Sequence, residues 1–84
     1  MAQLRARFRE RLTEDRARLT AAVEAGDEAS IRAVVHRISG AGGMFGYAAL
    51  SERAAEVEET LDEGAGAAAV RGLVERLLAE IAAA

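Results

Sequence analysis

No proline occurs in the 84 residues of this chain. Because proline is the strongest helix breaker, nothing of that kind interrupts a helix anywhere in the sequence. Hydrophobic residues make up 51% of the chain, many of them alanine, whereas only 4% of residues are aromatic. This balance is typical of helices that pack through small side chains and gives β-sheet little support. We therefore expect an all-α fold.

Apolar residues recur at helical spacing in four segments, and glycine-containing stretches separate these segments. The spacing predicts helices over about residues 3–25, 28–45, 48–62 and 67–82. Gly26 supplies a helix stop and Asp27 an N-cap, Gly46 ends the second helix, and a turn around Gly64 precedes the fourth. Because the connections are only a few residues long, successive helices must run antiparallel and side by side. Residues 1–84 are therefore expected to form one domain, an antiparallel up-down-up-down four-helix bundle.

All 11 basic residues are arginines, and the formal net charge is −3. The chain as a whole therefore has no excess of positive charge that would attract nucleic acid, and we expect no nucleic-acid partner. Acids interleave with the arginines of the first helix, namely Glu10, Glu14 and Asp15, and we interpret this segment as a solvated face. The acids of the third helix are interpreted in the same way; they include Glu56, Glu58, Glu59 and Asp62. No apolar run approaches the roughly 20 residues that span a bilayer, so we expect no membrane contact and a cytoplasmic location.

His36, the single histidine of the chain, is the candidate functional residue. At about 100° per residue, Ile38 and Phe45 lie about 160° and 180° around the helix from it, so the imidazole points away from the core. Its neighbours within about 60° are small, with one exception. These neighbours are Ala29, Arg32, Ala33, Ser39, Gly40 and Gly43. Because the chain has no cysteine and no acid stands among these neighbours, we expect no metal site.

Three glycines, Gly40, Gly42 and Gly43, follow the histidine. Inside a helix they cost together roughly 3 kcal/mol relative to alanine, against a total stability of about 5–15 kcal/mol, so something must require them. Gly40 and Gly43 flank the imidazole. Because neither has a Cβ atom, they leave a shallow open surface over which a partner's backbone can approach the ring closely. Gly42 lies nearer the core face and is expected to permit tight helix packing. A flexible loop over residues 39–43, which splits the helix, is the open alternative.

The segment from His36 to Gly46, HRISGAGGMFG, followed by Leu50 and Ala54, resembles the signature of histidine phosphotransfer domains. The resemblance covers about residues 35–58, and beyond it only the number and length of the helices agree. It implies a phosphocarrier whose His36 accepts a phosphoryl group, on Nε2, from an aspartate of a response-regulator receiver domain. Imidazole is largely neutral near pH 7 and needs no triad to act as this nucleophile.

The same resemblance defines the expected partners and cofactors. The partners are receiver domains and a hybrid histidine kinase, Mg²⁺ is brought by the receiver, and this chain itself binds no cofactor. We expect a monomer. No GxxxxGKT or GxGxxG loop is present, so the chain is expected to be a carrier and not an enzyme that consumes ATP.

One position departs from the family's pattern, because a lysine commonly stands three residues after the histidine and this chain has Ser39. A hydroxyl can hydrogen-bond to phosphate but carries no charge. Arg32 and Arg37 are the expected substitutes for the lysine, and Arg32 is the better aligned with His36. The surface on which the partner docks is expected to consist of Ala33, Gly40 and Gly43.

Two other classes of protein fit parts of this sequence. A non-phosphorylated docking module would bind a receiver or a kinase through the same glycine surface, and Ser39 in the lysine position favours it. The dimerisation and phosphoacceptor region of a kinase would instead form a long two-helix hairpin.

Overall fold

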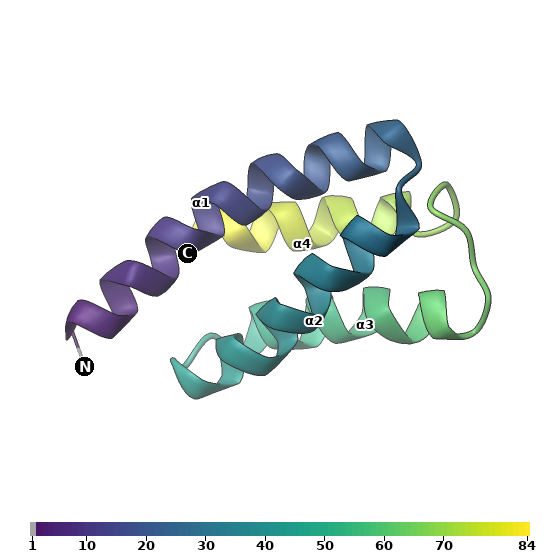
Figure 1. Ribbon diagram of the computed structural model, residues 1–84. Coiled ribbons are helices and arrows are strands. Elements are labelled where there is room, and N and C mark those ends of the chain that lie inside the picture. The colour runs from purple at the N-terminus through teal and green to yellow at the C-terminus, as the bar shows by residue number, and fades with distance from the viewer. Residues whose placement is uncertain (1) are drawn as a thin grey trace.

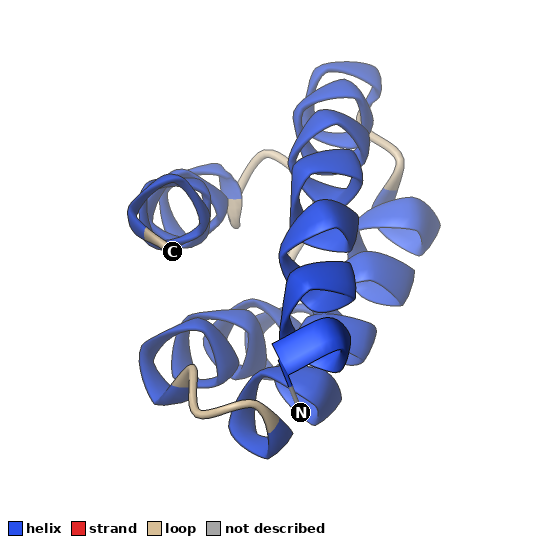
Figure 2. Ribbon diagram, turned by 90° about the vertical axis from the view of Figure 1, so that its left-hand side faces the viewer, coloured by secondary structure: helices blue, strands red, loops and turns tan. Residues whose placement is uncertain are grey.

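The computed structural model describes residues 2–84, which form four helices and no strand (Figure 1). The helices are α1 Ala2–Ala25, α2 Glu28–Met44, α3 Ala48–Asp62 and α4 Arg71–Ala83. Each helix runs antiparallel to its predecessor, and α4 packs against α1 as well as α3, which closes the bundle. Figure 2 shows the short loops that join the helix ends. The expected all-α, up-down-up-down four-helix bundle is confirmed.

The junction between α1 and α2 forms as the sequence predicts. Gly26 has a φ of +67°, a left-handed conformation that glycine adopts without a Cβ clash. The two carboxylate oxygens of Asp27 accept hydrogen bonds from the Ser30 hydroxyl at 2.6 Å and from the Ser30 backbone N–H at 3.1 Å. The hydroxyl bond first, and the backbone bond second, lower the pKa of Asp27 below its ordinary value of 3.8. Asp27 is therefore the N-cap of α2.

Helix α2 continues through the glycine-rich stretch and ends at Met44. The alternative of a flexible loop over residues 39–43 is therefore wrong. Phe45, expected as the last helical residue, is instead the C-cap, and its backbone N–H donates to the Ala41 carbonyl at 3.3 Å. Gly46 follows with a φ of +84°, which turns the chain out of the helix.

Helix α4 begins at Arg71, four residues after the expected start at residue 67. Residues 67–70 form turns, in which the Ala69 N–H donates to the Gly66 carbonyl at 3.0 Å. Ala67 and Val70 are nevertheless buried in the core. Val70 belongs to the apolar stripe that the spacing predicts for the fourth helix, but spacing does not distinguish a helix from successive turns that bury the same side chains.

The core lies between the four helices, and the expected apolar residues of α2 and α3 are buried except Phe45, which is half-buried. In α1 the spacing predicts a stripe from Leu4 to Val23. Leu12 and Leu19 are buried, but Leu4 is 49% exposed. The first turns of α1 extend beyond the ends of the other helices (Figure 1).

Candidate functional site

His36 lies in the middle of α2 and its side chain is 77% exposed. Val34, Val35 and Ile38, its neighbours in sequence, are buried on the opposite side of the helix. The helical geometry that buries these three side chains therefore directs the imidazole into solvent. The predicted exposure of His36 is confirmed.

The imidazole of His36 is hydrogen-bonded to a carboxylate of the neighbouring helix. Its Nδ1 lies 2.7 Å from Oε2 of Glu58 on α3, whose side chain is 24% exposed. In a neutral imidazole, a carboxylate partner retains the proton on Nδ1, so Nε2 carries the lone pair. The contact thus orients the ring and selects the tautomer whose reactive nitrogen is Nε2.

Sequence reasoning missed Glu58, which it interpreted as solvated surface. The available signal was the register of the hairpin formed by α2 and α3. Arg32 and His36 are one turn apart on α2, and their partners Asp62 and Glu58 are one turn apart on α3. One antiparallel alignment of α2 against α3 therefore forms both side-chain pairs. The spacing of side chains along a single helix does not show how that helix is aligned with its neighbour.

Arg32 lies near His36, as expected, but its guanidinium is engaged in an ion pair with Asp62. The two side chains are 43% and 60% exposed. Exposed pairs of this kind contribute about 0–1 kcal/mol to stability. Arg32 can therefore exchange Asp62 for another anion at low cost.

Arg37 is directed away from His36, and its expected role beside the phosphate is not met in this structure. Its guanidinium donates to the carboxylate of Asp15 on α1. The Asp15 side chain is only 3% exposed, so the interpretation of this acid as part of a solvated face is wrong. A buried carboxylate requires a counterion, which holds Arg37 on the α1 side of α2.

Ser39 lies beside His36, and its hydroxyl donates to the His36 backbone carbonyl at 2.9 Å. The Ser39 carbonyl in turn accepts from the Ser51 hydroxyl of α3 at 2.6 Å. The single hydroxyl proton of Ser39 is therefore used within its own helix. It must rotate before it can donate to an anion bound at the imidazole.

The three glycines of α2 have two different surroundings. A Cβ at Gly40 would meet no atom within 4 Å, and one at Gly43 would meet only the Ser51 Oγ, at 3.9 Å. A Cβ at Gly42 would lie 3.2 Å from the Ser51 nitrogen and 3.3 Å from the Tyr47 carbonyl oxygen. Gly42 thus permits the close approach of α2 and α3, as expected. Gly40 and Gly43 leave open surface beside the imidazole, and Ala33 is exposed on the same side.

The fold and the site together define a class of protein, a four-helix module that presents an exposed histidine beside an open glycine surface. The family model described as Hpt domain matches residues 3–84, and the chain belongs to this family. The resemblance drawn from residues 35–58 is thereby confirmed over nearly the whole chain. Hpt domains are phosphocarriers rather than enzymes, and they interact with response regulators and kinases of two-component systems.

Comparisons with curated proteins and with solved structures found no match. None of the helices described here is long and apolar enough to span a membrane.

Proposed function

We propose that His36 carries a phosphoryl group between aspartates of response-regulator receiver domains. The observation that carries the proposal is the exposed imidazole whose Nδ1 is bonded to Glu58 at 2.7 Å. This bond leaves the Nε2 lone pair facing outward, available to an electrophile on a partner. Membership of the Hpt family supports phosphotransfer as the class of reaction.

In the forward step the Nε2 lone pair attacks the phosphorus of a receiver's aspartyl phosphate. The N–P bond forms as the aspartyl O–P bond breaks, and the carboxylate leaves with that electron pair. The imidazole ring then carries positive charge, which the Glu58 carboxylate at Nδ1 offsets. In the reverse step a receiver carboxylate attacks the phosphohistidine and returns the lone pair to Nε2. The Mg²⁺ that neutralises the phosphoryl oxygens is proposed to belong to the receiver.

Arg32 is proposed as the cation that replaces the missing lysine. It lies one turn before His36, and its exposed pair with Asp62 is easily exchanged for phosphoryl oxygens. Ser39 is proposed to add a neutral hydrogen bond once its hydroxyl leaves the His36 carbonyl. Arg37 takes no part in this arrangement, because Asp15 holds it on the other side of α2.

The receiver is proposed to dock on Ala33, Gly40 and Gly43. The absence of side chains at the two glycines lets a partner's backbone reach the imidazole, and nothing within the described residues occupies the space above Gly40. We also propose a monomer, because four helices of one chain already enclose the core. The kinase-region alternative required a two-helix hairpin, which the four-helix bundle contradicts.

Incubation with a receiver carrying a labelled aspartyl phosphate, in the presence of Mg²⁺, tests the proposal. Label should move to the domain, should be stable in base and labile in acid, and should be absent from His36→Gln. The competing docking module is favoured by the Ser39 hydroxyl, which is already bonded to the backbone. Receiver binding without transfer of label would establish that module and refute the carrier.

A further inference from the structure

Two side-chain pairs connect α2 and α3 at the surface. His36 contacts Glu58, and one turn away Arg32 contacts Asp62. The side chains of the second pair are 43% and 60% exposed, so solvent reaches both of them. The two pairs together contain one permanent cation and two carboxylates. A phosphoryl group on His36 would bring a third anion, with about −2 charge and three acceptor oxygens, to the same surface.

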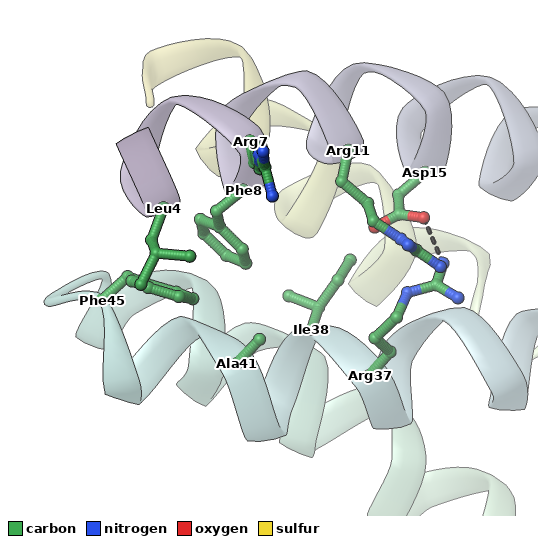
Figure 3. Close-up of a pocket in the computed structure, with 9 residues that line it drawn as sticks. All are labelled: Leu4, Arg7, Phe8, Arg11, Asp15, Arg37, Ile38, Ala41 and Phe45. Carbon is green, nitrogen blue, oxygen red and sulfur yellow. Dashed lines mark hydrogen bonds and ion pairs between the residues drawn. The ribbon is translucent and has the colours of Figure 1, made fainter. Parts of the chain in front are cut away.

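Arg32 is the cation of α2 that can reach this phosphoryl group. Helix α2 contains two arginines and no lysine. Figure 3 shows the other arginine, Arg37, extending toward α1, where it pairs with Asp15. Residues four positions apart on a helix are neighbours, so the guanidinium of Arg32 lies within reach of an anion on His36. Before phosphorylation, however, its charge is already paired with Asp62.

Asp62 and a phosphoryl group on His36 would therefore compete for one guanidinium. A bidentate bond to either anion occupies a planar edge of that group, and a carboxylate already bound offsets its charge toward a second anion. Linkage makes the effect reciprocal, because the pair with Asp62 disfavours phosphorylation by the factor by which phosphorylation disfavours the pair. An exposed ion pair shifts an equilibrium of this kind by up to about fivefold.

We propose that Asp62 is a positioning residue that destabilises phosphohistidine by holding Arg32 away from the phosphoryl group. The inference rests on the proposed carrier function and adds a residue that sets how readily the phosphoryl group is passed on. A carrier that held its phosphoryl group too strongly would not release it, so a competing carboxylate favours transfer to the next aspartate. Without Asp62, the guanidinium of Arg32 would be free to bind the phosphoryl oxygens.

The test measures the equilibrium distribution of label between His36 and the aspartate of a receiver, with Mg²⁺ present. In this reversible step the Nε2–P bond forms as the aspartyl O–P bond breaks, and the electron pair of the broken bond stays on the carboxylate. Asp62→Asn should raise the ratio of phosphohistidine to aspartyl phosphate by about threefold to fivefold, because it releases Arg32. Arg32→Ala should lower the ratio by about threefold or more. Asp62→Glu keeps the carboxylate and should match the unmodified domain within about twofold.

A double-mutant cycle separates competition for Arg32 from simple charge repulsion. In Arg32→Ala, adding Asp62→Asn should change the ratio by less than about twofold, since no guanidinium is left to release. The matched control is Glu59→Gln, which removes the same charge from an exposed acid of α3 that no ion pair found within residues 2–84 engages. It should also change the ratio by less than about twofold.

Two results would reduce the effect to general repulsion between anions and overturn the proposal. One is an equal rise of the ratio in Asp62→Asn and Glu59→Gln. The other is a full effect of Asp62→Asn in the Arg32→Ala background. A lower ratio in Asp62→Asn would also overturn it, because Asp62 would then hold Arg32 in place for the phosphoryl group.

Stability and label on the unmodified domain complete the test. Because the Arg32–Asp62 pair is exposed on both sides, Asp62→Asn should keep the circular dichroism spectrum and nearly the urea midpoint of the unmodified domain. Label on the unmodified domain, with an unchanged ratio in Asp62→Asn, would overturn this inference and leave the carrier function intact. Absence of label from the unmodified domain would refute the carrier function, and this inference with it.

Discussion

Gly40 leaves open surface beside His36, whereas Gly42 permits the close packing of α2 and α3. Replacing each glycine by alanine in turn distinguishes these two roles. Both lie inside α2, where alanine exceeds glycine in helix propensity by about 1 kcal/mol. A Cβ at position 40 would meet no atom within 4 Å. Gly40→Ala should therefore raise the free energy of unfolding by about 1 kcal/mol.

At Gly42 the same propensity gain is opposed by a clash. The new Cβ would lie 3.2 Å from the Ser51 nitrogen and 3.3 Å from the Tyr47 carbonyl oxygen, and both are backbone atoms at the start of α3. Relief requires a shift of α3 against α2, and overpacking of this kind costs about 1–3 kcal/mol. Gly42→Ala should therefore change the free energy of unfolding by about 0 to −2 kcal/mol, so that the two variants differ by about 1–3 kcal/mol.

Urea unfolding followed by circular dichroism measures both free energies. Thermal melts should agree, because 1 kcal/mol shifts the Tm of a domain of this size by about 4–8 °C. Equal stability of the two variants would refute the close approach of α2 and α3 at Gly42. A loss of stability in Gly40→Ala would show that Gly40 serves packing.

Four further outcomes are expected from single sites. Gly40→Leu should leave the fold intact but block receiver binding in a pull-down, and unfolding would contradict the open surface. Glu58→Ala should slow phosphotransfer on the order of tenfold, since it removes one charged hydrogen bond, and Glu58→Gln should restore much of the rate. Arg37→Ala should cost about 2–4 kcal/mol in urea unfolding because it leaves Asp15 buried and unpaired, and Asp15→Leu/Arg37→Met should recover most of this. The pKa of Asp27 is lowered, so its extra stabilisation over Asp27→Asn should persist above pH 3.8 and disappear as the pH falls through the lowered value, which acid-unfolding curves measure.

The parts of the fold that the sequence predicted are those with local causes. Asp27 caps α2 through hydrogen bonds to Ser30, three residues on, and Gly46 ends the same helix through its own backbone conformation. The exposure of His36 also follows from the helix wheel of one segment. The start of α4 was wrong because Ala67 and Val70 are buried without being helical.

The parts of the site that the sequence could not predict depend on neighbouring helices. Glu58 and Glu59 are adjacent acids on α3, yet only Glu58 is bonded to His36, a choice made by the rotation of α3 against α2. Asp15 was indistinguishable from Glu14 in sequence, although Asp15 is the buried partner of Arg37. The sequence alone does not distinguish the roles of two acids on the same helix. Their roles depend on which of them faces a neighbouring helix after packing, and not on their spacing.

The two arginines of α2 show how this packing decides the chemistry available at His36. Each is committed to a different neighbour, Arg32 to Asp62 of α3 and Arg37 to Asp15 of α1. The first pair is exposed on both sides and contributes little to stability, whereas breaking the second leaves a buried charge. A phosphoryl group can therefore recruit Arg32 but not Arg37 without destabilising the bundle. Under the proposed function, Arg32 from the turn before the histidine would compensate for Ser39, on the side of α2 that faces Glu58 of α3.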